Sequence, residues 1–272
     1  MHQPHYFPWF GQINKIASSD VFVILDNVQF SRGGKMNRQK FLCLNHEPKY
    51  ITIPYKKKGF MEIPFKNLEI ASPDDWQLKH ANFIINNYSK YPYFDEVWSN
   101  IEFIFKKKYK TVCEVSCDST LVILKMLGIN TRVIFQSDIE NGDNYKNNEM
   151  IINIMKKLNM DIYLSGNGAK KYMDLNEYKE HDISVFYQIF KYPEYTKKID
   201  HNITDISIMD ILFNVGIMET KKLVFQSVTE STLNYHEWNS TWFVNLNAFS
   251  TDIAAIAFRV ILNHYSYFLL DS

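Results

Sequence analysis

Three side chains near the start of the chain could move protons. His2 and His5 carry imidazoles, whose ordinary pKa is near neutral and therefore suits a general base. Asp26 carries a carboxylate that could hold a hydroxyl or an amine of a substrate. We therefore take these three residues as the candidate catalytic residues.

Candidate binding residues occupy the same stretch of chain. The cations among them suit a diphosphate or a carboxylate, and the aromatic rings suit stacking on a sugar or a base. The alternative is a proline-aromatic turn followed by a solvated basic loop. The residues concerned are Gln3, Tyr6, Trp9, Lys15, Gln29, Arg32, Asn37 and Arg38.

The elements around these residues must place them at one edge of a sheet. Pro4 and Pro8 exclude a regular helix or a central strand from the first loop. An amphipathic pattern then predicts a helix that opens at Gly11 and ends near Ser18. The unbroken apolar run at 21–25 predicts a strand buried on both faces, as in a parallel sheet. Because ligands bind at the carboxyl ends of such strands and at helix N-termini, both flanking polar loops lie on the expected ligand edge.

Two further strand ends carry polar residues. Residues 162–164 predict a strand, and backbone amides of the glycine-containing loop after it could cradle an anion or the phosphate of an adenine nucleotide. The glycine spacing is not that of a Walker A sequence, and a plain left-handed turn is the alternative. A predicted strand at 132–135 ends in the polar residues 136–138. The candidate binding residues of the glycine-containing loop are Ser165, Gly166 and Tyr172.

The alternation of predicted strands and helices is typical of an α/β fold with a mostly parallel sheet flanked by helices. Consecutive helices in the middle of the chain predict a helical insertion, and helices also end the chain. Further strands are predicted at 41–44, 50–54, 64–70 and 184–190. Helices are predicted at 76–88, 95–109, 115–127, 147–158, 204–214 and 253–262.

The composition excludes several classes of protein. The 30 Lys and Arg residues equal the 30 Asp and Glu residues, so no bulk attraction to nucleic acid or to an anionic membrane is expected. Neither a signal peptide nor an apolar stretch of membrane-spanning length is recognised, which predicts a cytoplasmic protein without a membrane span. Cys43, Cys113 and Cys117 are too few for a disulfide framework and lack partners for a zinc site, so we expect reduced thiols and no metal.

The N-terminal residues also carry a family resemblance. The segments concerned are residues 2–11, 20–23, 26–30 and 37–38. They closely resemble the WbqC-like family, whose bacterial members are typically encoded in O-antigen and other surface-polysaccharide gene clusters. The resemblance covers residues 1–216 and leaves 217–272 as a divergent C-terminal extension. It also implies a short apolar strand before Gln3 in the middle of the sheet, and we expect this strand to be missing because the sequence starts at Met1.

The order of elements is similar to that of adenylate-forming nucleotidyltransferases such as pantothenate synthetase. Those enzymes form an acyl-adenylate and pass the acyl group to an amine. Residues 28–30 lie where they have a Gln-Phe pair at a strand end, but their His-x-Gly-His motif would fall on residues 9–12, where both histidines are absent. We therefore expect a nucleotidyltransferase-like N-terminal half, with ATP or another nucleotide as the candidate cofactor and with adenylation left open.

The leading hypothesis is a transferase of bacterial O-antigen or other surface-polysaccharide biosynthesis that passes an acyl or aminoacyl group to a nucleotide-linked amino sugar. Its partner would be a small sugar nucleotide or amino sugar, and not a nucleic acid. A sugar-nucleotide-forming nucleotidyltransferase would need a divalent metal, for which no carboxylate pair is evident. The alternative from another class is a non-catalytic protein of the same pathway that binds a sugar nucleotide or an assembly partner.

Overall fold

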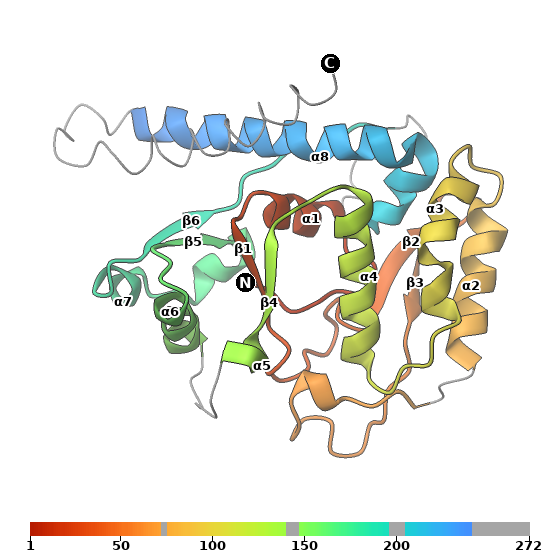
Figure 1. Ribbon diagram of the computed structural model, residues 1–272, viewed down its shortest axis with the longest axis horizontal. Helices are drawn as coiled ribbons and strands as arrows, with labels where there is room; N and C mark the ends of the chain where they lie inside the picture. Colours follow the sequence, from red (N-terminus) through yellow and green to blue (C-terminus); the bar gives the residue numbers. More distant parts are fainter. Residues whose placement is uncertain (72–74, 140–146, 196–204, 241–272) are drawn as a thin grey trace.

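The computed structural model describes residues 1–71, 75–139, 147–195 and 205–240, with side chains as far as residue 228. These residues form a mixed α/β fold in which helices pack around short strands, and the long helix α8 (Ile208–Ser240) lies across one side (Figure 1). The helix predicted at 253–262 lies outside the described residues.

Two short pairs of parallel strands form the part of the fold nearest the N terminus. β1 (Val21–Ile24) pairs with β4 (Arg132–Phe135), and β5 (Ile162–Ser165) pairs with β6 (Ser184–Tyr187). Apolar runs of this kind form parallel strands because both faces can be covered by helices. The prediction of parallel strands at these places is therefore confirmed.

The first residues of the chain lie between the two parallel pairs (Figure 1). The Met1 side chain packs against the apolar cluster that contains Tyr163 of β5 and also against the one that contains Val23 of β1. The backbone N–H of His2 donates to the Val23 carbonyl at 3.0 Å, and the His2 carbonyl accepts from the Leu25 N–H at 2.9 Å. His2 therefore lies beside β1, at the carboxyl end of that strand.

The third pair of strands is an antiparallel hairpin. β2 (Arg38–Leu42) and β3 (Pro48–Thr52) are joined by a connection far too short for a parallel crossover. The expected single, mostly parallel sheet is therefore not what the described strands form. They make three two-stranded sheets, and isolated bridges add single residues such as His2 beside β1 and Ile206 beside β2.

The helices of the described residues largely fall where they were predicted. The helix predicted at 115–127 begins earlier, because Thr111 and Glu114 form a capping box at its N-terminus. The helix predicted at 95–109 ends sooner and tightens into a short 3₁₀ helix. The α-helices are α1 (Phe10–Ala17), α2 (Asp75–Tyr88), α3 (Phe94–Ile101), α4 (Val112–Met126), α5 (Gln136–Ile139), α6 (Asn147–Lys157), α7 (Leu175–Lys179) and α8. The 3₁₀ helices are η1 (Phe65–Asn67), η2 (Glu102–Phe105) and η3 (Asn167–Lys171).

The strand predicted at 64–70 is wrong. The chain forms η1 there, because its backbone bonds to the loop after β1 and not to a neighbouring strand. The Phe65 N–H donates to the Val28 carbonyl and the Lys66 N–H donates to the Asp26 carbonyl, both at 2.8 Å. η1 therefore fixes the backbone of the polar loop that carries Asp26.

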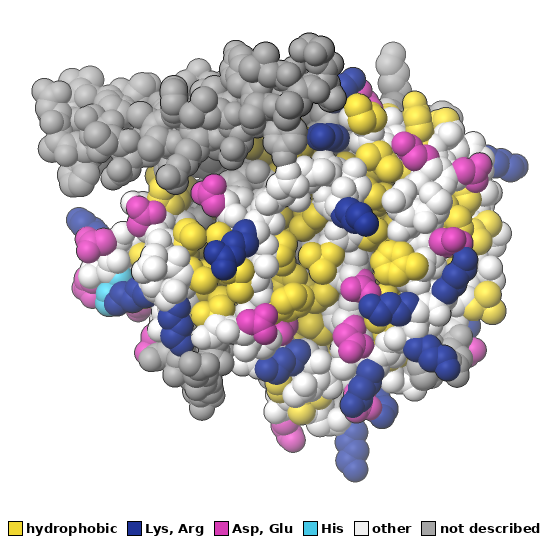
Figure 2. Space-filling model, viewed as in Figure 1, with side chains coloured by type: hydrophobic (Ala, Val, Ile, Leu, Met, Phe, Trp, Pro, Cys, Tyr) yellow, Lys and Arg dark blue, Asp and Glu magenta, His cyan; other side chains and the backbone are white. Residues whose placement is uncertain are grey.

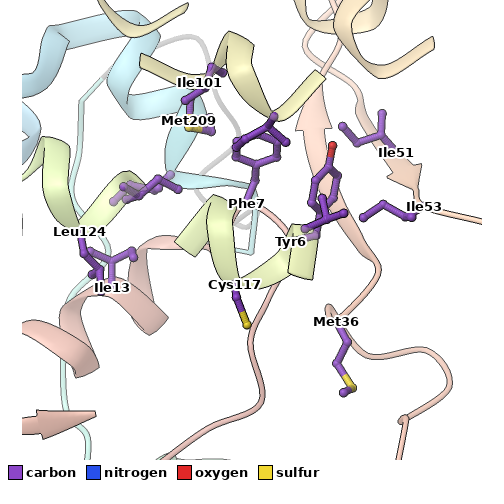
Figure 3. Close-up of a cluster of buried hydrophobic side chains, with 14 of the residues drawn as sticks. Tyr6, Phe7, Ile13, Met36, Ile51, Ile53, Ile101, Cys117, Leu124 and Met209 are labelled. Atoms are coloured by element: carbon purple, nitrogen blue, oxygen red, sulfur yellow. The ribbon is translucent and has the colours of Figure 1, made fainter. Parts of the chain in front are cut away.

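The proline-aromatic loop, residues 2–9, contributes side chains to the hydrophobic core. Tyr6 and Phe7 are both fully buried, and the rings of Phe7 and Phe41 meet edge to face with centroids 6.0 Å apart. In Figure 3 the two side chains lie between Ile51 and Ile53 of the hairpin region on one side and helices on the other. Burying an aromatic ring of this size contributes about 1.5–3 kcal/mol, so the loop holds strands and helices together.

The surface carries charges of both signs. On the face seen in Figure 2, Lys and Arg side chains are interspersed with Asp and Glu side chains and with apolar ones. Among the described helices, none combines the length and the apolar character that crossing a membrane requires.

Candidate functional site

The loop before α1 has a strained backbone held by buried hydrogen bonds. Phe7 has a φ of 44°, in the left-handed region that residues other than glycine rarely occupy. Its N–H donates to Ser119 Oγ at 3.0 Å, and its carbonyl accepts from Ser207 Oγ at 3.0 Å. Strain of this kind persists only where the surroundings impose it, and it gathers at functional sites. The backbone therefore supports the choice of this loop as a candidate site.

The loop brings His2 and His5 together. Their ring centroids are 4.7 Å apart and the rings meet edge to face. His2 Nδ1 donates to the Gln3 carbonyl at 2.9 Å. His5 Nδ1 is buried and makes no hydrogen bond with any residue that the structure describes. A buried ring nitrogen without a partner is costly, so this atom needs an explanation.

Burial and neighbouring cations hold both imidazoles neutral. Burial, and to a smaller extent the Lys15 charge, lower the pKa of His2 to about 3. Burial also lowers the pKa of His5 well below its usual value, and the charges of His2, Lys35 and Lys15 act in the same direction. The expectation of near-neutral pKa values is therefore not met, because both rings are desolvated among cations.

Lys15 and Gln3 belong to the same cluster. Lys15 Nζ donates to the Met1 carbonyl at 3.2 Å, and burial lowers the pKa of this amine to about 8. Gln12 Nε2 donates to the Gln3 carbonyl at 3.3 Å. Gln3 therefore contributes a backbone oxygen that binds two side chains of the cluster.

Asp26 lies at the carboxyl end of β1 and joins it to the end of β4. Its Oδ1 accepts from the Ser137 N–H at 3.0 Å, and its Oδ2 accepts from Ser137 Oγ at 2.6 Å. The side chain is buried. Polar residues that follow two parallel strands thus meet at one edge of the sheet.

Tyr6, Gln29 and Asn37 are held by the protein itself. The Tyr6 hydroxyl lies 3.0 Å from His80 Nδ1, and the whole side chain is buried in the core. Gln29 Nε2 donates to the Met61 carbonyl at 2.9 Å, and Asn37 Nδ2 donates to the Ile53 carbonyl at 3.0 Å. Tyr6 is therefore part of the core and not an accessible pocket wall, because core packing leaves no room for a ligand beside it.

Trp9, Arg32 and Arg38 lie apart from the histidines on more open surface. Lys35 Nζ lies 4.8 Å from the centre of the Trp9 ring, and the Arg32 guanidinium lies 4.8 Å from the Phe60 ring. The Arg38 guanidinium lies 4.5 Å from the Tyr50 ring and donates through Nη2 to the Gly33 carbonyl at 2.7 Å. Each cation thus rests on an aromatic face, which orients its charge.

The glycine-containing loop after β5 is not the plain left-handed turn that was the alternative to an anion-binding loop. It forms η3, and Gly166 has a φ of −77°, so the left-handed turn is absent from this loop. Ser165 is buried with its hydroxyl 3.3 Å from Met173 Sδ, whereas Tyr172 is 72% exposed at the end of η3. Ser165, Gly166 and Tyr172 therefore lie at the end of β5. The Ser165 carbonyl accepts from the Gln188 N–H at 2.8 Å, and Gln188 Nε2 donates to the Gly11 carbonyl of α1 at 2.7 Å.

The residues that sequence reasoning left out are Lys40 and Asp205, together with Lys35. Lys40 Nζ lies 2.9 Å from Asp205 Oδ1 and Lys35 Nζ lies 3.5 Å from Asp205 Oδ2. Arg38 and Lys40 are two apart on β2 and therefore share a face, but the predicted strand starts at 41 and does not include them. These cations are the groups that could hold the phosphates of a nucleotide.

The described residues offer no ready metal site, and the depression described below lies away from the candidate residues. No group of three or more His, Cys, Asp or Glu side chains within these residues could hold a metal ion. An open depression of about 540 Å³ lies at the turn of the hairpin, where Leu44, Asn45 and Asn87 line it. None of the candidate residues lines this depression.

Gly11 allows Trp9 to lie flat on the start of α1. A Cβ at this position would lie 2.4 Å from the Trp9 ring and 2.6 Å from the Phe190 ring. We expect Gly11→Ala to displace the Trp9 ring and lower the free energy of unfolding by about 1–3 kcal/mol, as overpacking does. Denaturant unfolding followed by tryptophan fluorescence measures this change. Gly168→Ala is the matched control, since nothing lies within 4 Å of its Cβ, and an equal loss in both variants would contradict the packing argument.

Comparisons with known proteins agree with the resemblance. The sequence pattern of the WbqC-like protein family matches residues 3–222. The chain is 28% identical over 216 residues to an uncharacterised protein, Rv1507c, of Mycobacterium tuberculosis (strain ATCC 25618 / H37Rv), and the match covers 79% of this chain and 92% of that protein. No solved structure matches the chain. The match to the family pattern spans most of the sequence, and the chain belongs to the WbqC-like protein family.

Proposed function

We propose that this protein is an enzyme of bacterial surface-polysaccharide biosynthesis that transfers an acyl or aminoacyl group to a nucleotide-linked amino sugar. The observation that carries the proposal is the buried Nδ1 of His5, which has no hydrogen-bond partner among the described residues. It lies beside His2 on a strained loop, at the strand edge where ligands of α/β proteins bind. A substrate group that bonds to this nitrogen would explain why it is left free.

The roles of the side chains follow from their charges. Asp26 holds the substrate amine, because a carboxylate has about four acceptor sites and Ser137 uses two of them. The substrate amine attacks the acyl carbon and His5 Nδ1 accepts the amine proton. The bond from the acyl carbon to the donor breaks as the amide forms, and coenzyme A or AMP leaves. Burial is the main cause of the low pKa of His5, and the Lys35 charge adds to it. An anionic ligand beside Lys35 would offset that charge and so shift the pKa of His5 upward.

The pathway and the reaction rest on different support. The surface-polysaccharide pathway is supported by the family resemblance alone, since the M. tuberculosis relative is uncharacterised. The transfer is supported by the site. Activation of the acyl group by ATP stays part of the proposal through the similarity of element order to adenylate-forming nucleotidyltransferases.

A transfer assay with purified protein tests the proposal. UDP-, dTDP- and GDP-linked amino sugars are each incubated with an acyl-coenzyme A, or with a carboxylic acid and magnesium ATP, and products are read by mass spectrometry. We expect acylated sugar nucleotide, and a loss of about 100-fold in turnover for His5→Gln, the usual size of a general-base effect. Asp26→Asn should also lose activity, whereas His181→Gln, on an exposed residue, should not. Intact activity in both His5→Gln and Asp26→Asn would overturn the assigned roles.

A specific observation favours a second candidate, a non-catalytic protein that binds a sugar nucleotide. The pKa of His2 is lowered to about 3 and that of His5 falls well below its usual value, so both rings are weak bases in this arrangement. A sugar nucleotide that raises the melting temperature but yields no product with any donor would decide for the binding protein.

A further inference from the structure

The hairpin β2–β3 is extended on one side by two segments that are distant in sequence. Lys40 forms a bridge with Ile206, and the Ser207 N–H donates to the Lys40 carbonyl at 2.9 Å. Trp9 in turn forms a bridge with Ser207. The order across this part of the molecule is therefore β3, β2, residues 205–207 and the end of the proline-aromatic loop.

The two faces of this arrangement differ in character. Side chains alternate between faces along an extended chain. Gln39 and Phe41 point inward and are fully buried, and Ile206 beside β2 is fully buried as well. The opposite face, which we name the hairpin face, carries partly exposed side chains that contact one another. These are Trp9, Lys35, Arg38, Lys40, Tyr50 and Asp205.

The hairpin face has three cations and a single carboxylate among these side chains. Lys40 Nζ lies 2.9 Å from Asp205 Oδ1, and Lys35 Nζ lies 3.5 Å from Asp205 Oδ2. Each ammonium group thus pairs with one oxygen of the same carboxylate. Two oxygens of a phosphate can bind the two ammonium groups in the same way. Their side chains are 27% and 18% exposed and that of Asp205 is 36% exposed, so an anion from solution can reach them.

Arg38 adds a charge that Asp205 does not neutralise. Its Nη2 donates to the Gly33 carbonyl at 2.7 Å, while its Nε is shielded from solvent and makes no hydrogen bond within the described residues. Arg38 and Lys40 both lie over the Tyr50 ring, at 4.5 Å and 5.5 Å from its centre. Arg38 and Lys40 thus share one aromatic ring, and together they could supply two cations of a diphosphate site.

An aromatic ring lies at each end of this group of cations. Tyr50 is 40% exposed beside Arg38 and Lys40, and Trp9 lies beside Lys35 at the other end. Planar rings next to phosphate-binding cations suit a nucleotide, whose base or sugar can stack while its phosphates pair with the cations. A long nucleic acid is a poorer fit, since the chain has no net charge.

We infer that the hairpin face binds the diphosphate of a nucleotide-linked substrate, and that the Asp205 carboxylate competes with this diphosphate for Lys35 and Lys40. The inference rests on the proposed function for the identity of the substrate. Lys35 also joins the two regions, because its charge is among those that act on His5.

Equilibrium binding of inorganic pyrophosphate and of UDP, with uridine as the uncharged comparison, tests the inference on the full chain. Lys40→Gln and Arg38→Gln should each weaken binding of pyrophosphate and UDP about tenfold, the usual effect of losing one charge-assisted hydrogen bond. Asp205→Asn should strengthen both about threefold to tenfold, because it removes the competing carboxylate. Uridine should respond to none of these variants.

A control on the same hairpin separates a site from general attraction of charge. Lys49→Gln removes a cation of the same hairpin, but Lys49 lies 5.9 Å from the Phe83 ring of α2 and away from Tyr50. It should leave binding unchanged. Equal weakening by Lys49→Gln and Lys40→Gln, or weaker binding by Asp205→Asn, would overturn the inference.

The binding experiment and the transfer assay can reject the hairpin face and the transfer reaction separately. Pyrophosphate needs no acyl donor, so binding with the expected opposite signs but without product would retain the hairpin face and reject the transfer. Product formation without any effect of Lys40→Gln, Arg38→Gln or Asp205→Asn on UDP binding would retain the transfer and reject the hairpin face. Melting temperatures of the variants, measured alongside, show that each is folded.

Discussion

Asp210→Ala is expected to lower the free energy of unfolding by about 4 kcal/mol, because it leaves the buried Tyr88 hydroxyl and the partly buried Tyr195 hydroxyl without this acceptor. Asp210 is fully buried on α8, where its Oδ1 accepts from the Tyr88 hydroxyl at 2.9 Å and its Oδ2 accepts from the Tyr195 hydroxyl at 2.5 Å. The Tyr88 hydroxyl accepts in turn from the Leu42 N–H at 2.9 Å. One carboxylate thus ties α8 to α2, to the hairpin and to the segment after β6. Denaturant unfolding at pH 7 measures the loss.

The pH dependence of Asp210→Asn tests the same network with the side-chain volume preserved. Burial raises the pKa of the Asp210 carboxyl, although the hydrogen bonds from Tyr195 and Tyr88 act in the opposite direction. A carboxyl whose pKa is higher in the folded state binds its proton more tightly when folded. Its contribution to stability is therefore complete below the unfolded pKa of about 3.9 and is lost as the pH rises through the folded pKa.

The stability of the unmodified protein relative to Asp210→Asn should accordingly fall as the pH rises from about 4, and then stay constant above the raised pKa. Asp138→Asn, at an exposed carboxyl, is the control and should show no such fall. A difference that widens with rising pH would mean that the hydrogen bonds outweigh burial and lower the pKa of Asp210.

Local pattern was enough to predict the elements that flank the candidate site. The apolar periodicity after the first loop predicts a helix, and the structure has α1 at Phe10–Ala17. The unbroken apolar run after it predicts a buried strand, and the structure has β1 at Val21–Ile24. Both patterns involve residues that are close in the sequence, so these predictions do not depend on contacts with distant segments.

The meeting of Asp26 and Ser137 follows from topology and not from local pattern. Each residue comes after an apolar strand, and the carboxyl ends of parallel strands share one edge of a sheet. The two residues are far apart in sequence, but the rule needs only the strand direction. The observed hydrogen bonds between them agree with this reasoning.

Other contacts could not be predicted because they depend on where distant segments return. Lys40 meets Asp205 only because residues 205–207 pair beside β2, and no pattern in either segment marks this pairing. Tyr6 in an irregular loop could face solvent or the core, and contacts such as the one with His80 on α2 decide for the core. The histidine pKa values were missed for the same reason, since burial by distant segments sets them.

Gly216→Ala is expected to lower the free energy of unfolding by about 3 kcal/mol or more, because the substitution combines backbone strain with a steric clash. Gly216 has a φ of 81° and a ψ of 172°, a conformation essentially confined to glycine, and it kinks α8 at this point. A Cβ there would lie 2.6 Å from the Tyr93 ring. The kink falls where the family resemblance was expected to end, yet α8 continues beyond it with Thr220 and Val224 fully buried.

Two further variants separate the strain at Gly216 from the clash. Gly59→Ala places alanine at a φ of 70° with only the tip of Glu62 within 4.0 Å, so it should lose about 1 kcal/mol by strain alone. Tyr93→Ala removes the clashing ring. In this background Gly216→Ala should lower the free energy of unfolding by less than in the unmodified protein, but the loss should remain measurable. An equal cost in both backgrounds would assign the whole effect to the backbone. A cost near zero in the Tyr93→Ala background would mean that the kink tolerates alanine, and that ring packing alone requires glycine where α8 turns toward α1.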